Sequence, residues 1–330
     1  MPGIYGPTTT TDEVLEGVDL TGRRVVVTGA ATGLGRESAR AFAAHGASVT
    51  VLARSAERAA GAVAEIAALV PGAELEAAVA DLGDLSTVRA FAETFLAGHD
   101  TLDLLVNNAG VMACPFGHTA QGFETQFGTN HLGHFLLTGL LAPALLRAAA
   151  PRVVTLSSAG HSRSDVDLDD PNFEHGGYSP WVAYGRSKTA NALFARELAR
   201  RAGPKGLLSF SVHPGGIVTD LGRHLTEELL LEMAAFARER SAAAGAAPEG
   251  EGSGDITWKS VEQGAATQVW AAVAPELAGH NGAYLADCGL GVLGANPGAN
   301  GFMAYLLDDD HAARLWELSE RLVGATFDVS

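Results

Sequence analysis

The chain has 330 residues, of which 47% are hydrophobic and 18% charged, and its formal net charge is −16. This length allows one large α/β domain or two smaller ones, and the composition is typical of a globular enzyme. The negative charge and the lack of a basic stripe argue against a nucleic-acid partner. Because residues 1–11 are polar and no long apolar run occurs, we expect neither a signal peptide nor a membrane span, and we predict a cytoplasmic protein.

Strand-like and helix-like segments alternate along most of the chain. Short β-branched or apolar runs predict strands at 24–28, 47–53, 75–80, 102–106, 153–157 and 208–213. Longer amphipathic or alanine-rich segments predict helices ending near 45, at 56–69, 85–97, 122–149 and 182–201, and near the C-terminus at 309–323. This alternation predicts an α/β fold of the Rossmann type, with a doubly wound parallel sheet and helices on both of its faces.

Two regions depart from this alternation. Residues 1–20 are predicted to be a loose N-terminal arm in front of a single domain at 21–330. Residues 221–240 are charged and amphipathic, which predicts a helix, and 241–254 are rich in Ala, Gly and Glu, which predicts a flexible loop. We expect the segment 221–260 to be a substrate-side insertion that covers a binding cleft. An ordinary surface insertion is the alternative.

A glycine-rich loop between the first predicted strand and the first helix indicates a dinucleotide site. The residues expected near the phosphates are Gly29, Ala31, Thr32, Gly33, Leu34 and Gly35. Glycine lets the backbone turn tightly and approach a phosphate, and the helix N-terminus offers free N–H groups and a partial positive charge. The spacing, Gly-x-x-x-Gly-x-Gly, is a relative of the common dinucleotide fingerprint.

The ends of the second and third strands carry the residues expected at the adenosine half. An acid after the second strand would bind a free ribose 2′-hydroxyl, whereas this chain has Arg54, which suits a 2′-phosphate. We therefore predict NADP(H), with NAD(H) possible, although Arg54 could instead simply cap or solvate the next helix. Asp81 and Leu82 are expected at the adenine edge, and a turn-forming aspartate is the alternative.

A tyrosine and a lysine stand four residues apart in the predicted helix at 182–201. Tyr184 and Lys188 would therefore lie one above the other. A nearby ammonium favours the phenolate and should lower a tyrosine pKa that is ordinarily about 10. Such a pair can move a proton to or from an alcohol oxygen. The two cysteines, Cys114 and Cys288, indicate neither a disulfide framework nor a metal site.

These motifs resemble those of the short-chain dehydrogenases/reductases, in the branch of the retinol-dehydrogenase-like and WW-domain-oxidoreductase-like enzymes. The similar motifs are T-G-A-A-T-G-L-G at 28–35, N-N-A-G at 107–110, N-H-L-G-H-F-L-L-T at 130–138, T-L-S-S at 155–158, Y-x-x-x-K at 184–188 and the loop from H-P-G at 213–219. The resemblance covers residues 22–220, with weaker echoes at 258–270 and 282–288. It implies hydride transfer between NADP(H) and an alcohol/carbonyl pair on an apolar small molecule.

The resemblance also implies a catalytic tetrad. Tyr184 would be the general acid/base, and Lys188 would hold the cofactor ribose and lower the Tyr184 pKa. Ser158 would bind the substrate oxygen, and Asn130 would order a water in the proton relay. Further cofactor contacts are implied for Asn108, Ala109, Gly110, Pro214, Gly215 and Thr219.

Three polar residues that lie close in sequence to the predicted tetrad are expected to be structural. Ser157 precedes the catalytic serine and should bond the backbone, because the family's serine is the second of the pair. His131 and His134 are structural in this branch.

The substrate side departs from compact family members in two ways. The segment 160–180, between Ser158 and Tyr184, makes that gap roughly twice as long, as in the retinol-dehydrogenase branch. Its aspartates lack the spacing of an EF-hand, so we expect a solvated loop and no metal; they are Asp165, Asp167, Asp169 and Asp170. We also expect no membrane anchor of the kind that many retinoid enzymes of this branch carry, so a retinoid substrate is not implied.

Several functional alternatives stay open. A biosynthetic ketoreductase acting on a polyketide or steroid is one, and a catalytically idle NADP-binding sensor or scaffold protein is another. Candidate apolar residues of the substrate pocket are Met112, Phe116, Trp181 and Leu221. Family members commonly form dimers or tetramers through their two long helices, so a homodimer or homotetramer through 122–149 and 182–201 is possible.

Overall fold

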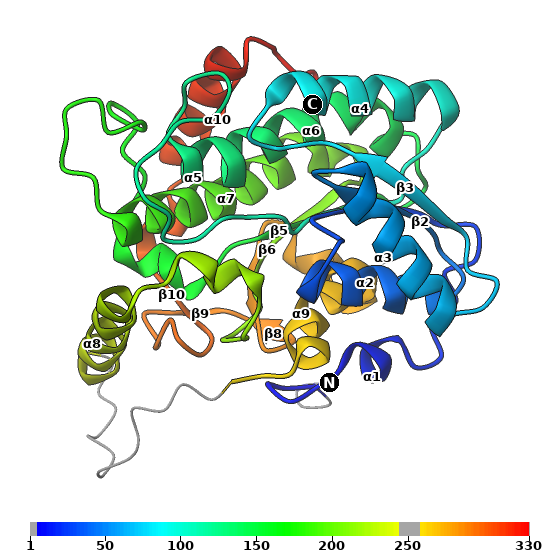
Figure 1. Cartoon of the computed structure of the whole chain (residues 1–330), viewed down its shortest axis with the longest axis horizontal. Helices are drawn as coiled ribbons and strands as arrows, with labels where there is room; N and C mark the ends of the chain where they lie inside the picture. The colour runs from blue at the N-terminus through cyan, green and yellow to red at the C-terminus, as the bar shows by residue number, and fades with distance from the viewer. Residues whose placement is uncertain (1–4, 244–257, 330) are drawn as a thin grey trace.

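The structure is a computed structural model that describes residues 5–243 and 258–329, with side chains to residue 240 in the first range. An eight-stranded sheet forms its centre (Figure 1). The strands are β1 (Arg24–Thr28), β2 (Ser48–Ala53), β3 (Leu75–Val79), β4 (Leu104–Asn107), β5 (Arg152–Leu156), β6 (Leu208–His213), β7 (Tyr284–Ala286) and β8 (Gly289–Leu290). They lie in the order β3-β2-β1-β4-β5-β6-β7-β8, and every neighbouring pair is parallel except β7 with β8. The predicted Rossmann-type fold is confirmed.

Helices cover both faces of the sheet, as predicted (Figure 1). One face packs α2 (Gly33–Ala44), α3 (Ala56–Leu69) and α9 (Val261–Val273). The other packs α4 (Leu85–Gly98), α6 (Gly133–Leu145) and α7 (Pro180–Ala202), with α10 (Asp309–Val323) outside them. Successive residues of β1 serve opposite faces, with Val25 and Val27 in one core and Val26 in the other, because strand side chains alternate. Strand order reverses between β1 and β4, which is where dinucleotides bind in such folds.

The long helix predicted at 122–149 is interrupted. It consists of α5 (Thr125–Phe127), a π-helical turn (Gly128–Leu132) and α6, which ends at Leu145. In the turn, the Gly133 N–H bonds the Gly128 carbonyl five residues back, and such turns often mark functional sites. The residues of the turn are compatible with an ordinary helix, so the π-helical turn could not be predicted from them.

The C-terminal helix α10 lies across α7 and reaches α6 (Figure 1). Trp316 of α10 stacks on Phe194 of α7 at 5.9 Å and meets Phe135 of α6 edge-on at 4.9 Å. These contacts bury part of the surface through which 122–149 and 182–201 were expected to pair with another copy. An oligomer formed on this side would therefore include α10 in its interface.

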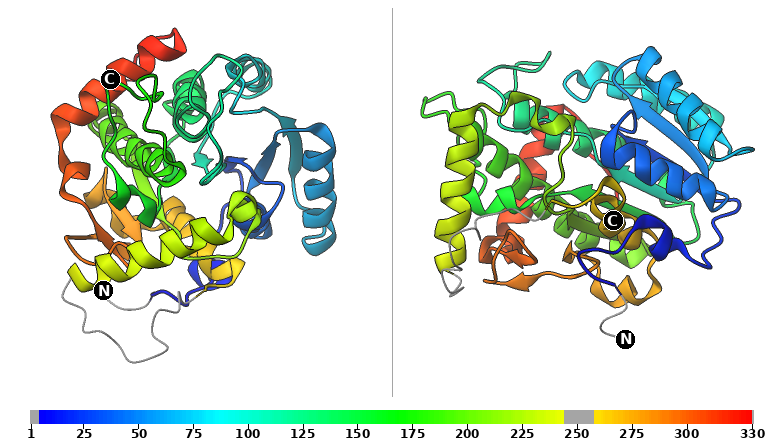
Figure 2. Two further views of the ribbon diagram at one scale, coloured as in Figure 1. Left: turned by 60° about the vertical axis from the view of Figure 1, so that its left-hand side comes forward. Right: turned by 60° about the horizontal axis from the view of Figure 1, so that its bottom comes forward.

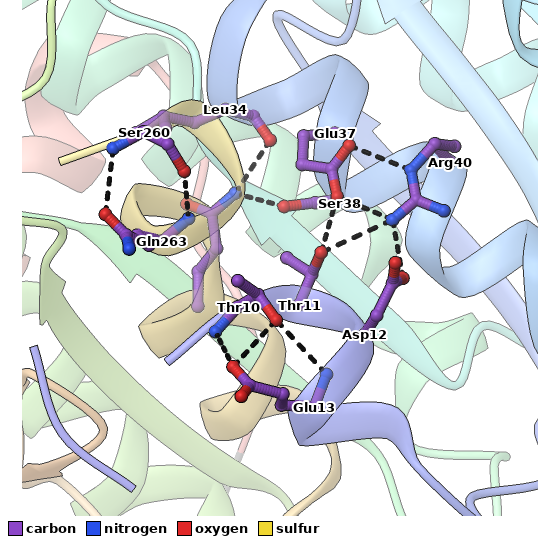
Figure 3. Close-up of polar contacts among 11 residues, drawn as sticks. Thr10, Thr11, Asp12, Glu13, Leu34, Glu37, Ser38, Arg40, Ser260 and Gln263 are labelled. Carbon is purple, nitrogen blue, oxygen red and sulfur yellow. Dashed lines mark hydrogen bonds and ion pairs between the residues drawn. The ribbon is translucent and has the colours of Figure 1, made fainter. Parts of the chain in front are cut away.

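The N-terminal region is not the loose arm that was predicted. Residues Thr11–Leu15 form a short helix, α1, with Thr10 and Glu13 in a capping box (Figure 3). Thr11 and Leu15 are fully buried. The Thr11 hydroxyl donates to Glu37 of α2 at 2.5 Å, and Arg40 of α2 joins this carboxylate to Asp12. Residues Thr11–Leu15 are therefore part of the core and contact α2 and α9, and the prediction failed because these few residues lack a helical period.

The predicted helix at 221–240 is present as α8 (Glu227–Ala243), after a 3-10 turn at Asp220–His224. Figure 2 shows α8 (yellow-green) on the outside of the molecule. Most of the loop predicted at 241–254 lies outside the described residues. A second small sheet pairs β9 (Val292–Leu293) with β10 (Gly301–Phe302).

Within residues 5–243 and 258–329, no helix is both long and apolar enough to cross a membrane. In the same residues, no cluster of three or more His, Cys, Asp or Glu side chains could hold a metal ion. Cys114 and Cys288 are buried and unpaired. In the 160–180 insert, Asp167 accepts the N–H groups of Asp169 and Asp170, so it orders the local turn.

Candidate active site

The glycine loop turns sharply where β1 meets α2. Gly29 and Gly33 have φ of +64° and +56°, a region that favours glycine. A Cβ on Gly35 would lie 2.5 Å from both the Gly29 carbonyl oxygen and Asn108 Nδ2, so this position has no room for a side chain. Thr32 is the N-cap of α2, yet its side chain makes no capping hydrogen bond. The first turn of α2 therefore offers backbone N–H groups to an anion, and the loop fits a dinucleotide phosphate.

The N-N-A-G segment after β4 connects this loop to the predicted tetrad. Asn108 Nδ2 donates to the Thr28 carbonyl at 2.9 Å, and the Thr28 hydroxyl accepts the Asn108 and Ala109 N–H groups at 2.9 and 3.0 Å. The Ala109 Cα lies 2.8 Å from where a Gly29 Cβ would stand. At the other end, a Cβ on Gly110 would lie 3.2 Å from Asn130 Oδ1 and 3.7 Å from Lys188 Nζ. The glycine loop and the tetrad therefore share one edge of the sheet.

The loop after β6 closes on the glycine loop. The Thr219 methyl lies 3.4 Å from the position of a Gly33 Cβ, so these two predicted cofactor residues are neighbours. Gly215 has φ of +97°, and a Cβ there would meet the Lys259 side chain at 2.8 Å. Lys259 pairs with Asp287 at 2.5 Å, and its N–H donates to the Gly216 carbonyl at 2.9 Å. Thus Lys259 and Asp287 hold the loop that contains Pro214, although the sequence motifs did not single them out.

The residues predicted at the adenosine half have mixed environments. Arg54 is exposed at the carboxyl end of β2. Asp81 is also exposed, and its carboxylate accepts the Gly83 N–H at 2.9 Å, which is the turn role considered as the alternative. The Leu82 side chain is buried in the core, and its carbonyl oxygen lies 2.6 Å from the position of a Gly133 Cβ. Its backbone, rather than its side chain, is therefore what Leu82 can offer to a nucleotide.

Tyr184 and Ser158 lie together at the start of α7 and the end of β5. Ser158 Oγ accepts the Gly160 N–H at 3.1 Å and lies 3.4 Å from the position of a Gly160 Cβ. A Cβ on Gly160 would stand 2.7 Å from the Tyr184 ring, so Gly160 leaves room for the phenol. Ser157 is buried and donates to the Lys188 carbonyl at 2.8 Å. Ser157 therefore has the structural role expected of it, while Ser158 faces the tyrosine.

The expectation that Lys188 makes Tyr184 more acidic is wrong for this structure. Burial raises the pKa of Tyr184 to about 12, and the hydrogen bond with Ser158 only partly opposes this. Lys188 Nζ lies 5.6 Å from the ring centroid and donates to the Leu156 carbonyl at 3.0 Å. Burial also lowers the Lys188 pKa, to about 8. Desolvation of both groups therefore outweighs the charge of the neighbouring ammonium.

The Asn130 side chain bonds to the segment after β4 and to α7. Its Oδ1 accepts the Val111 N–H at 2.8 Å, and its Nδ2 donates to the Val111 carbonyl and to Ser187 Oγ, both at 2.9 Å. The Ser187 hydroxyl in turn donates to the Tyr184 carbonyl at 2.8 Å. Ser187 was not predicted, and only its place inside the Y-x-x-x-K motif could have suggested it. The side-chain amide therefore has no donor left, and a water at Asn130 would bind at an acceptor oxygen, the backbone carbonyl or Oδ1.

A small apolar cluster covers Tyr184, which is only 3% exposed. The cluster joins side chains before α5, on α7 and on or before α8: Met112, Ala113, Trp181, Leu225, Leu229 and Met233. Trp181 Nε1 donates to the Leu229 carbonyl at 3.1 Å. Arg163 stacks on both Trp181 and Phe236, at 4.8 and 4.1 Å. Of the predicted pocket residues, Met112 and Trp181 belong to this cluster.

The other two predicted pocket residues lie elsewhere. Phe116 is 48% exposed and packs on His118 and Tyr178. Leu221 lies in the 3-10 turn before α8 and is not a member of the apolar cluster. Their hydrophobic character could not by itself tell which apolar residues face the tyrosine.

Comparison with known proteins identifies the family. The family model described as short chain dehydrogenase matches residues 23–230, more than half of the chain. The chain belongs to the short-chain dehydrogenases/reductases. It is 41% identical to the short-chain dehydrogenase/reductase prx1 of Penicillium roqueforti, over 90% of this chain and 84% of that protein, and 40% identical to retinol dehydrogenase 12 of Mus musculus, over 82% and 79%. These matches support the predicted branch.

A solved structure shares this fold. An uncharacterized protein from Mycobacterium paratuberculosis is 33% identical, with a TM-score of 0.71 over 97% of this chain and 99% of that one. This short-chain dehydrogenase/reductase is therefore an oxidoreductase of a family that binds a nicotinamide cofactor.

Proposed function

We propose that the protein is an NADP(H)-dependent oxidoreductase that transfers a hydride between the nicotinamide and an alcohol/carbonyl pair on an apolar small molecule. The observation that carries the proposal is the shared edge at which the N-N-A-G segment touches Gly29 on one side and the Asn130–Lys188 pair on the other. A nucleotide on the glycine loop and a substrate at Tyr184 would then meet at the switch point of the sheet.

The protein's own groups would bind, orient and protonate the substrate. When bound, the dinucleotide supplies the hydride, and the chain supplies position and electrostatics. Ser158 and Tyr184 would donate hydrogen bonds to the substrate oxygen, and Tyr184 would give it a proton during reduction. A Tyr184 pKa of about 12 keeps this hydroxyl protonated near neutral pH, which suits the donor role. Lys188 would hold the ribose. The Asn130 carbonyl would order a water that returns a proton to Lys188.

Two local features support the finer parts of the proposal. Arg54 is exposed at the end of β2, where a cation would bind the 2′-phosphate that distinguishes NADP from NAD. The groups packed around Tyr184 are apolar, so a substrate that displaces them should be apolar as well. We propose that α8 and the segment just before it cover this site, and that a substrate enters when α8 moves away.

The test compares wild type with Tyr184→Phe and Arg54→Ala. NADPH oxidation is followed with a panel of apolar ketones, aldehydes and quinones, and with polyketide-like and steroid ketones. We expect Tyr184→Phe to lose at least about 100-fold in kcat while its NADPH Kd stays near that of wild type. Arg54→Ala should raise the KM for NADPH and leave that for NADH unchanged. Near-wild-type turnover by Tyr184→Phe, or a strong NADH preference of the wild type, would reject the corresponding assignment.

A further inference from the structure

Two buried histidines of the 130–138 segment have different partners. His131 Nε2 bonds Ser319 of α10 at 2.8 Å, so it faces the C-terminal helix. His134 bonds with both ring nitrogens toward the site: Nδ1 lies 2.8 Å from the Asn130 carbonyl, and Nε2 lies 2.8 Å from the Thr28 hydroxyl. Burial lowers the pKa of each histidine to about 3, so both rings are neutral at working pH.

The partners of His134 determine its tautomer. A carbonyl oxygen can only accept, so Nδ1 must carry the proton and donate it to Asn130. Nε2 is then an acceptor and must receive the Thr28 hydroxyl proton. That direction is consistent, because the Thr28 oxygen already accepts the N–H groups of Asn108 and Ala109. A single chain of hydrogen bonds therefore runs from the N-N-A-G segment through Thr28 and His134 to the Asn130 carbonyl.

The two ends of this series of hydrogen bonds lie at the two halves of the proposed site. Ala109 packs against Gly29 of the nucleotide loop, and Asn130 lies in the π-helical turn beside Gly110 and Lys188. The Asn130 carbonyl has two lone pairs, of which His134 takes one and leaves the other for a water.

We propose that His134 is a positioning residue that sets the Asn130 carbonyl for the proton relay through Nδ1 and fixes the N-N-A-G segment beside the nucleotide through Nε2. This inference rests on the proposed function. It assigns to His134 a part in turnover that the sequence motifs alone had led us to treat as purely structural.

The two functions of the ring can be separated by substitution. His134→Asn places an amide N–H where Nδ1 stands, so it keeps the Asn130 bond and loses the Thr28 bond. His134→Gln places an amide oxygen near Nε2, so it keeps the Thr28 bond and loses the Asn130 bond. His131→Gln is the matched control, because it alters an equally buried ring in the same segment that faces α10.

The expected results differ between the variants. His134→Gln should lower kcat by about tenfold or more, because loss of one hydrogen bond in a buried site changes a rate or binding constant by about tenfold. The NADPH KM should stay within about twofold of wild type. His134→Asn should raise the NADPH KM and Kd by about tenfold and keep most of kcat. It should also speed hydrogen exchange of the Asn108 and Ala109 amides in the nucleotide-free protein. His131→Gln should change only the melting temperature.

The outcomes that overturn the inference are distinct from a failure of the proposed function. If both His134 variants match His131→Gln in kcat, KM, Kd and amide exchange, His134 only stabilises the fold. If wild type neither binds nor oxidises NADPH, the proposed function fails. Hydrogen exchange of the Asn108 and Ala109 amides then still shows whether the Thr28–His134 contact fixes the N-N-A-G segment. If this exchange is unchanged in His134→Asn, the inference about His134 is wrong.

Discussion

Substitution of Gly35 by alanine probes the packing of the glycine loop directly. Its Cβ would lie 2.5 Å from the Gly29 carbonyl oxygen and 2.9 Å from the Gly29 carbonyl carbon. Ordinary contact begins at 3.4 Å, so the loop would have to move by about 0.9 Å. These are backbone atoms that cannot rotate away, and forced overpacking of this kind costs about 1–3 kcal/mol. That cost is at least as large as the gain of about 1 kcal/mol that alanine otherwise brings to a helix.

Because the moved backbone would face the phosphates in the proposed function, we expect Gly35→Ala to raise the NADPH Kd by at least about tenfold. Fluorescence titration measures the Kd, and calorimetry measures the melting temperature. Gly61→Ala is the matched control, since Gly61 is an exposed residue of α3 and nothing lies within 4 Å of its Cβ position. It should raise the melting temperature by about 2 °C and leave the Kd unchanged.

The pair of variants makes the reasoning refutable. If Gly35→Ala binds NADPH as tightly as Gly61→Ala, the close approach of α2 to Gly29 and Asn108 does not determine the shape of the nucleotide site. A lower melting temperature with unchanged binding would have the same consequence, because the loss would then belong to the core rather than to the loop.

Three further predictions concern other parts of the chain. Leu15→Ala should cost about 2–5 kcal/mol in the free energy of urea unfolding, because Leu15 is fully buried, and an unchanged midpoint would show that the N-terminal segment is dispensable. Arg163→Leu removes the guanidinium stacked on Trp181 and Phe236, so hydrogen exchange along α8 should speed up several-fold; unchanged exchange would mean that other contacts hold α8. Finally, kcat/KM for NADPH should fall as pH rises through about 8, where Lys188 loses its proton, and this step should be absent in Lys188→Met.

Most of the fold could be predicted because its signals are local. Each parallel strand is a short apolar run, each helix has an amphipathic or alanine-rich pattern, and the alternation of the two fixes the architecture. The N-terminal helix was missed because α1 has only five residues, and its burial depends on Glu37 and Arg40 of α2. The π-helical turn was missed because the choice between backbone hydrogen-bond patterns is made by tertiary packing.

The same distinction explains what was predicted of the site. In the structure Ser158 and Tyr184 both lie beside Gly160, and Gly33 lies against Thr219, because these motifs follow strands or begin helices at one edge of the sheet. The direction of the Tyr184 pKa shift could not be predicted from the motifs. The burial of Tyr184 depends on Leu229, which follows it by 45 positions and belongs to another helix.

Lys188 and Tyr184, two buried ionisable groups of the site, also give its pH dependence a definite sign. Burial lowers the Lys188 pKa to about 8, below its unfolded value of about 10.4, so the unfolded chain binds more protons between these values and the contribution of Lys188 to stability rises with pH there. Activity should move in the opposite direction, because the ammonium that would hold the ribose is lost over the same range. Tyr184, with a pKa of about 12, stays protonated throughout and remains able to donate. A fall in kcat/KM together with a gain in stability above pH 8 would thus assign the transition to Lys188, since loss of the fold would lower both.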